Sequence, residues 1–150
     1  MIEPGSPAPE FTLRDQDLSK VALADFAGRR LVLAFYPGDF SPVCSDQLSI
    51  YQEVLGEISD RGASLVGISV DGAFCHQAFR KQLGLGMPLL ADFHPKGGVS
   101  AAYGAYQSDR GFNNRSLVLV DPDGTVEWSH ASPSDLEIPG ANLIFDALDR

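Results

Sequence analysis

The chain has 150 residues, of which 44% are hydrophobic, and a formal net charge of -9 at pH 7. This length suffices for one domain with a buried core, so residues 1–150 are expected to form a single domain. The acidic charge argues against nucleic acid as a partner, because phosphates need a basic surface. No apolar run approaches the ~20 residues that span a membrane. The N-terminus lacks the features of a signal peptide, so no membrane attachment and a cytoplasmic location are expected.

The first third of the chain predicts a β-hairpin, a buried strand and a long helix. Apolar and polar residues alternate in 11–14 and in 20–23, which is typical of two paired strands. The apolar run 31–36 predicts a buried strand. The amphipathic pattern of 42–60 predicts one helix, which Gly62 is expected to end.

The rest of the chain predicts strands and helices in alternation. Strands are expected at 65–70, 88–91, 116–120 and 125–130, the last two joined by the turn Asp121-Pro122-Asp123-Gly124. Helices are expected at about 73–83, 95–103 and 140–148. This order of elements predicts the α/β class, as a sandwich in which helices flank a mixed central sheet.

One segment, Pro37-Gly38-Asp39-Phe40-Ser41-Pro42-Val43-Cys44, connects the buried strand to the long helix. Ser41 is a favoured N-cap and Pro42 fits the first helical position, which places Cys44 in the first turn. The helix dipole and the free amides of that turn favour a thiolate nucleophile. The ring of Pro37 can shield the sulfur, and the Ser41 hydroxyl can donate to the sulfur or to a bound oxygen. The competing interpretation is that Cys44 is a small buried packing residue.

The other charged and sulfur-containing residues limit the possible chemistry. Asp39 and Asp46 oppose a thiolate at Cys44 if they lie close and unpaired, so a fixed cation from elsewhere in the chain is expected to offset them. The two cysteines are too few for a secreted disulfide scaffold. Cys75 and His76 are adjacent and do not share a helix face, and no second pair of ligands occurs, so no metal site is expected.

The cysteine motif resembles that of the peroxiredoxins, in which a proline, three residues, a threonine or serine and two further residues precede the cysteine. The resemblance covers essentially the whole chain and includes 5–13, 91–93, 99–104 and 114–116. The last two segments are most similar to the alkyl hydroperoxide reductase E-type members, followed by the bacterioferritin-comigratory (PrxQ) type. The resemblance implies a thioredoxin-like fold and a peroxidase that requires no cofactor and no metal.

The family's site residues can be carried over to this chain one at a time. Cys44 corresponds to the peroxidatic cysteine, which attacks a hydroperoxide and becomes a sulfenic acid. Arg115 corresponds to the cation that completes the cysteine's pocket, and it is always protonated. Ser41 stands where the family usually has threonine, and Gln47 stands where close members often carry glutamate. Gln47 can support Arg115 by a hydrogen bond but cannot neutralise its charge.

Cys75 is expected to act as the resolving cysteine, which condenses with the oxidised Cys44 into an intramolecular disulfide. A thioredoxin-like donor or another thiol reductant is then expected to reduce that disulfide. E-type members often lack such a cysteine, so an alternative remains for Cys75, which is that it is a buried packing thiol. The corresponding alternative for the protein is a one-cysteine peroxidase that uses an external thiol.

Other functions and the oligomeric state stay open at this point. A thiol–disulfide oxidoreductase usually needs Cys-x-x-Cys, whereas Ser41 and Gln47 flank Cys44 at that spacing. A non-enzymatic redox-sensing or holdase-like module remains possible as an added role. The chain is expected to be a monomer or a homodimer.

Overall fold

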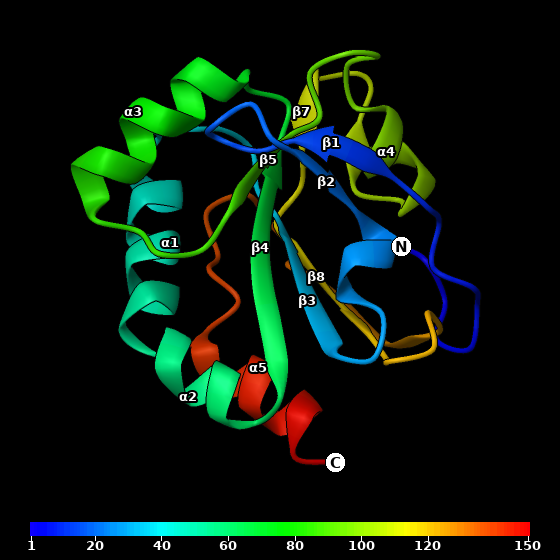
Figure 1. Cartoon of the computed structure of the whole chain (residues 1–150). Helices are drawn as coiled ribbons and strands as arrows, with labels where there is room; N and C mark the ends of the chain where they lie inside the picture. The colour runs from blue at the N-terminus through cyan, green and yellow to red at the C-terminus, as the bar shows by residue number, and fades with distance from the viewer.

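The computed structural model describes all residues, 1–150, and contains one seven-stranded sheet with helices on both faces (Figure 1). The strand order is β2-β1-β5-β4-β3-β8-β9. The strands of this sheet are β1 (Thr12–Arg14), β2 (Lys20–Ala22), β3 (Arg30–Phe35), β4 (Ala63–Ser69), β5 (Leu89–Ala91), β8 (Ser116–Val120) and β9 (Val126–Ala131). The helices are η1 (Leu23–Phe26), α1 (Pro42–Glu53), α2 (Leu55–Asp60), α3 (Ala73–Leu83), α4 (Gly98–Ala102) and α5 (Ala141–Leu148).

The sheet is mixed, as expected. Strands β3, β4 and β5 run parallel, whereas β8 pairs antiparallel with β3 and β9 pairs antiparallel with β8. The predicted opening hairpin is confirmed, because β1 and β2 pair antiparallel and β1 joins the sheet through β5. The expected thioredoxin-like α/β fold is therefore present.

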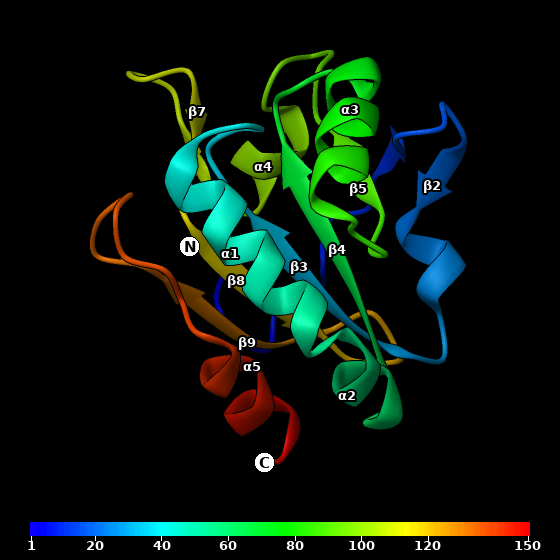
Figure 2. The same cartoon turned by 90° about the vertical axis from the view of Figure 1, so that its left-hand side faces the viewer.

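Alternating residues of the central strands build two separate cores. In β3, Val32 and Ala34 pack under α1, α2, α3 and α5, whereas Leu31, Leu33 and Phe35 face the N-terminal segment and α4. Figure 2 shows the face of the sheet that α1, α2, α3 and α5 cover, with α1 lying across the strands. Because both faces are covered, β3 and β8 are apolar after their first residues, Arg30 and Ser116, rather than alternating. This burial holds the ends of β3 and β8 in fixed positions.

Two features differ from the sequence-based expectations. The single helix expected over 42–60 is interrupted at Val54, whose φ of -109° and ψ of 9° end α1 before α2 begins. The β-branched Val54 and the nearby Gly56 are weak helix formers, which lowers the cost of a break there. A two-stranded hairpin, β6 (Tyr106–Gln107) and β7 (Phe112–Asn113), was not expected, since strands of two residues leave no periodic pattern.

The remaining elements match the expectations closely. Helix α3 ends at Gly84, which adopts the left-handed conformation with a φ of 66° and so caps the helix. Helix α4 is shorter than the expected 95–103, because it begins only after Gly97. No helix is both long enough and apolar enough to span a membrane.

Candidate active site

Cys44 lies in the first turn of α1, which follows β3 after the loop 36–41, as the sequence predicts. The Cys44 amide donates to Ser41 Oγ at 3.1 Å, so Ser41 is the N-cap and Pro42 begins the helix. The Cys44 side chain is completely buried between the sheet and the helix. The cap leaves the Ser41 hydroxyl proton free to donate to another group, because Oγ acts here only as the acceptor.

Arg115 immediately precedes β8 and reaches the sulfur of Cys44. Its Nη1 lies 3.1 Å from Cys44 Sγ and 2.8 Å from Gln47 Oε1, and its Nε donates to the carbonyl of Asp135. The guanidinium is held from three sides, and the residue is only 3% exposed. The antiparallel pairing of β3 with β8 places Ser116 opposite Phe35, so Arg115 lies at the C-terminal end of β3, near the start of α1.

The buried charge of Arg115 has no carboxylate partner. The ion pairs of the chain involve Arg30, Arg61, His76 and Arg110, but not Arg115. A buried charge without compensation costs several kcal/mol. Gln47 supplies a hydrogen-bond acceptor but no negative charge. A thiolate at Cys44 supplies that charge at 3.1 Å.

A second layer of hydrogen bonds fixes the orientation of Gln47. Gln47 Nε2 donates to the Tyr51 hydroxyl at 3.0 Å, and that hydroxyl donates to the carbonyl of Pro139 at 2.6 Å. Burial raises the pKa of Tyr51, so it remains a phenol that can donate. These contacts direct Gln47 Oε1 toward Arg115. Tyr51 is no part of the cysteine motif and was not predicted as a site residue, although its spacing of four residues from Gln47 puts the two on one helix face.

Replacing Tyr51 by phenylalanine is expected to destabilise the fold and weaken this support. The change leaves the Pro139 carbonyl without its donor and Gln47 Nε2 without its acceptor, at a cost of about 1–3 kcal/mol for buried groups. Chemical denaturation measures that loss. A variant as stable as the parent protein would show that the two polar groups find other partners.

Neither Asp39 nor Asp46 is the buried, unpaired carboxylate that would oppose a thiolate at Cys44. Asp46 is exposed, and the Asp39 side chain is fully buried but turned toward α3. Asp39 Oδ2 lies 2.6 Å from His76 Nδ1, and its Oδ1 accepts from the Tyr36 hydroxyl at 2.6 Å. His76 was considered only as a metal ligand in the sequence, and its contact with Asp39 has no local signal.

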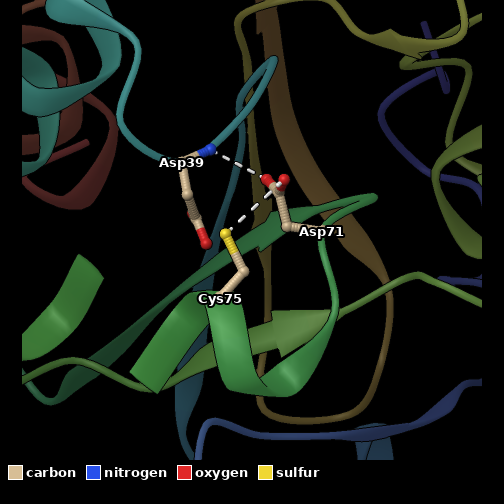
Figure 3. Close-up of side chains that lie close together, drawn as sticks. All are labelled: Asp39, Asp71 and Cys75. Carbon is tan, nitrogen blue, oxygen red and sulfur yellow. Dashed lines mark hydrogen bonds between the residues drawn. The ribbon is translucent and has the colours of Figure 1, made fainter. Parts of the chain in front are cut away.

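Cys75 lies in the first turn of α3 and contacts Asp71 rather than Cys44. Its Sγ is 4.0 Å from Asp71 Oδ1, and Figure 3 shows the thiol between Asp71 and Asp39. Burial, then the charges of Asp39 and Asp71, raises the pKa of Cys75 to about 12. The residue is half-buried and lines an open groove of about 470 Å³ with the exposed Phe74 and Phe93. Both cysteines are free thiols.

The two carboxylates beside Cys75 are already satisfied by the protein. Ligand atoms of Asp39, Asp71 and Cys75 lie within 4.8 Å of one another, a spacing that also suits a cation. However, Asp71 Oδ2 accepts from Ser69 Oγ at 2.6 Å and from the Asp39 amide at 2.8 Å (Figure 3 shows the second bond). With Asp39 bound to Tyr36 and His76, hydrogen bonds within the chain account for the cluster, and we assign it no ion.

Comparisons with known proteins agree with this geometry. Residues 4–129 match the model of the AhpC/TSA family. The alkyl hydroperoxide reductase E of Mycobacterium tuberculosis is 34% identical over 149 residues, which cover 99% of this chain and 97% of the relative. A peroxiredoxin of Schizosaccharomyces pombe is 36% identical over 135 residues, which cover 83% of this chain and 69% of the relative.

Solved structures show the same fold. The peroxidoxin BcpB of Mycobacterium tuberculosis superimposes with a TM-score of 0.85 at 25% identity, covering 99% of this chain and 96% of that chain. The reduced 2-Cys peroxiredoxin of Plasmodium vivax gives a TM-score of 0.89 at 27% identity, covering 99% and 81% of the two chains. The resemblance expected from the cysteine motif is thus confirmed over nearly the whole chain. The protein belongs to the AhpC/TSA family and is a peroxiredoxin, a thiol-dependent peroxidase.

Proposed function

We propose that Cys44 is the peroxidatic cysteine of this enzyme and that Arg115, Ser41, Gln47 and Pro37 form its pocket. The observation that carries the proposal is the buried guanidinium of Arg115, which has the Cys44 sulfur and no carboxylate beside it. This pairing favours the thiolate, which is the nucleophilic form of cysteine. The half-buried Pro37, seven residues before Cys44, offers an apolar, donor-free ring.

In the proposed reaction, the Cys44 thiolate attacks the terminal oxygen of hydrogen peroxide or an organic hydroperoxide. A sulfur–oxygen bond forms and the oxygen–oxygen bond breaks, which oxidises the sulfur to a sulfenic acid. The leaving oxygen takes up a proton and departs as water or an alcohol. Arg115, the Ser41 hydroxyl and the amides of the first turn of α1 stabilise the charge that develops on that oxygen.

Cys75 is proposed to resolve the oxidised Cys44. The thiol of Cys75 and the sulfenic acid combine into a disulfide, and the hydroxyl group and the thiol proton leave as water. A disulfide needs Cα atoms within about 7 Å, so the first turn of α1 or of α3 has to unwind locally. A thioredoxin-like dithiol or another thiol reductant then returns both cysteines to the reduced state.

A one-cysteine mechanism is the second candidate, and the surroundings of Cys75 favour it. In the structure, Cys75 contacts Asp71, and its pKa of about 12 keeps it protonated at neutral pH. A protonated thiol attacks poorly, so an external thiol competes for the sulfenic acid unless Cys75 first leaves this environment. The cytoplasmic location and the monomeric or homodimeric state stay predictions.

Mass spectrometry after one equivalent of peroxide distinguishes the two candidates. With Cys75 as resolver, each chain loses two free thiols and gains a linked Cys44–Cys75 peptide without forming a covalent dimer. Blocking the thiols before the peroxide is added should prevent both changes. A stable sulfenic acid at Cys44 beside a free Cys75 thiol would establish the one-cysteine mechanism, and an unmodified Cys44 would refute the assignment of the nucleophile.

A further inference from the structure

The buried pair of Asp39 and His76 shares one proton, as hydrogen-bond geometry requires. His76 Nε2 lies 3.1 Å from the carbonyl oxygen of Leu90, which can only accept, so Nε2 carries a hydrogen. In a neutral imidazole, Nδ1 then has a lone pair and no hydrogen. Yet Nδ1 lies 2.6 Å from Asp39 Oδ2, and both side chains are fully buried. A contact of this length needs a proton, held either by the imidazolium or by the carboxyl group.

This pair joins the segment that carries Cys44 to the helix that carries Cys75. Asp39 belongs to the loop between β3 and α1, five residues before Cys44, and His76 directly follows Cys75 in α3. The neighbouring Phe40 adds a second contact, because its ring meets that of Phe79 edge-on at 5.1 Å. The loop between β3 and α1 is therefore held against α3 by two side-chain contacts.

Disulfide formation needs a different arrangement, because the Cys44 sulfur now lies against Arg115 and the Cys75 sulfur lies against Asp71. We propose that Asp39 and His76 are positioning residues that form a proton-sharing clamp, which holds the loop on α3 and has to open before Cys75 can reach Cys44. This inference rests on the proposed resolving role of Cys75. The clamp keeps Cys75 between the carboxylates of Asp39 and Asp71 while peroxide is absent.

The groups packed around the pair leave the shared proton in place. The titratable groups that face the pair are Tyr36, which directly follows β3, Asp71 from the β4–α3 connection and Cys75 from α3, while β5 contributes only the Leu90 carbonyl. Burial and the nearby carboxylates keep Tyr36 and Cys75 protonated well above neutral pH, so neither supplies a proton readily.

Two substitutions of Asp39 distinguish the effect of the shared proton from the effect of the side-chain contact with His76. In Asp39→Asn, the amide oxygen accepts from Tyr36 and the amide N–H donates to a neutral His76, so the contact survives without a shared proton. In Asp39→Ala, the contact itself is lost. Both variants remove the same carboxylate from beside Cys75, so a difference between them reports the clamp and not the charge.

Hydrogen exchange of the reduced, full-length protein tests the clamp without peroxide. Amides in 38–44 and 73–77 are followed, and variants are compared at equal pH so that the intrinsic exchange chemistry cancels. Asp39→Ala should exchange about tenfold faster than Asp39→Asn in these segments, the effect of losing a buried hydrogen bond. The parent protein should match Asp39→Asn, because both keep the contact with His76. Amides of β8 serve as the reference that stays unchanged.

The proposal is overturned if Asp39→Ala and Asp39→Asn exchange alike. Should Asp39→Ala not fold, Asp39→Leu takes its place, because leucine is close to asparagine in size and makes no hydrogen bond. The same proteins are then treated with one equivalent of peroxide, and the linked Cys44–Cys75 peptide should form faster in Asp39→Ala than in Asp39→Asn. Equal rates of linkage would refute the gating of Cys75. No linked peptide in any of them would refute Cys75 as the resolver, while the exchange data still decide whether the clamp exists.

Discussion

Replacing Cys44 by serine is expected to abolish peroxide reduction while the fold is retained. Serine is nearly isosteric with cysteine, and its hydroxyl oxygen can accept the hydrogen bond that Arg115 directs at the sulfur. A hydroxyl does not ionise near neutral pH and its oxygen cannot take up a second oxygen atom, so no equivalent of the sulfenic acid forms. Peroxide consumption in the presence of a thiol reductant measures the loss, and circular dichroism checks the fold.

Cys75→Ser is the matched control, because it removes the other thiol of the chain and leaves the Arg115 contact untouched. Without a reductant, this control should still consume one equivalent of peroxide and stop at the Cys44 sulfenic acid. If Cys44→Ser kept about a tenth of the parent activity, a loss far too small for removal of the nucleophile, Cys44 would not be the reacting group.

The sequence predicts the elements of this fold well because their signals are local. The signal for β3 is one apolar run, and the signal for the start of α1 is Ser41 followed by Pro42. Each signal depends on a few neighbouring residues. Together they place Cys44 in the first turn of a helix at the end of a core strand. The interruption at Val54 was missed because its pattern of apolar residues continues across the break, so only the backbone shows it.

The contacts between distant segments were less accessible from the sequence. Resemblance to a family pointed to Arg115, but no local pattern indicates that this residue reaches Cys44 from across the sheet. Asp39 was expected to disfavour a thiolate if it lay close to Cys44 and unpaired, and the structure shows it paired with His76, 37 residues later. Such pairs depend on how α3 packs beside the loop, and one sequence without its fold carries no record of that packing.

Arg115→Ala is expected to slow the attack of Cys44 on peroxide by about 10²-fold or more, as does the loss of one oxyanion donor in other enzymes. Two effects combine in this loss. The thiolate of Cys44 loses the buried cation 3.1 Å from its sulfur, so the thiolate fraction at neutral pH falls. The leaving oxygen also loses a donor that is always protonated. Single-turnover kinetics measure the rate, and the ultraviolet absorbance of the thiolate measures its fraction.

Arg115→Lys separates charge from geometry. Lysine keeps a positive charge but lacks the planar fork that now contacts Cys44, Gln47 and the Asp135 carbonyl together. If charge alone matters, the lysine variant should retain most of the thiolate and most of the rate. If the fork matters as well, the thiolate should persist while peroxide attack stays slow, because the donors no longer meet the leaving oxygen. An unchanged rate and an unchanged thiolate fraction in Arg115→Ala would remove Arg115 from the site. The buried guanidinium would then have only a structural role.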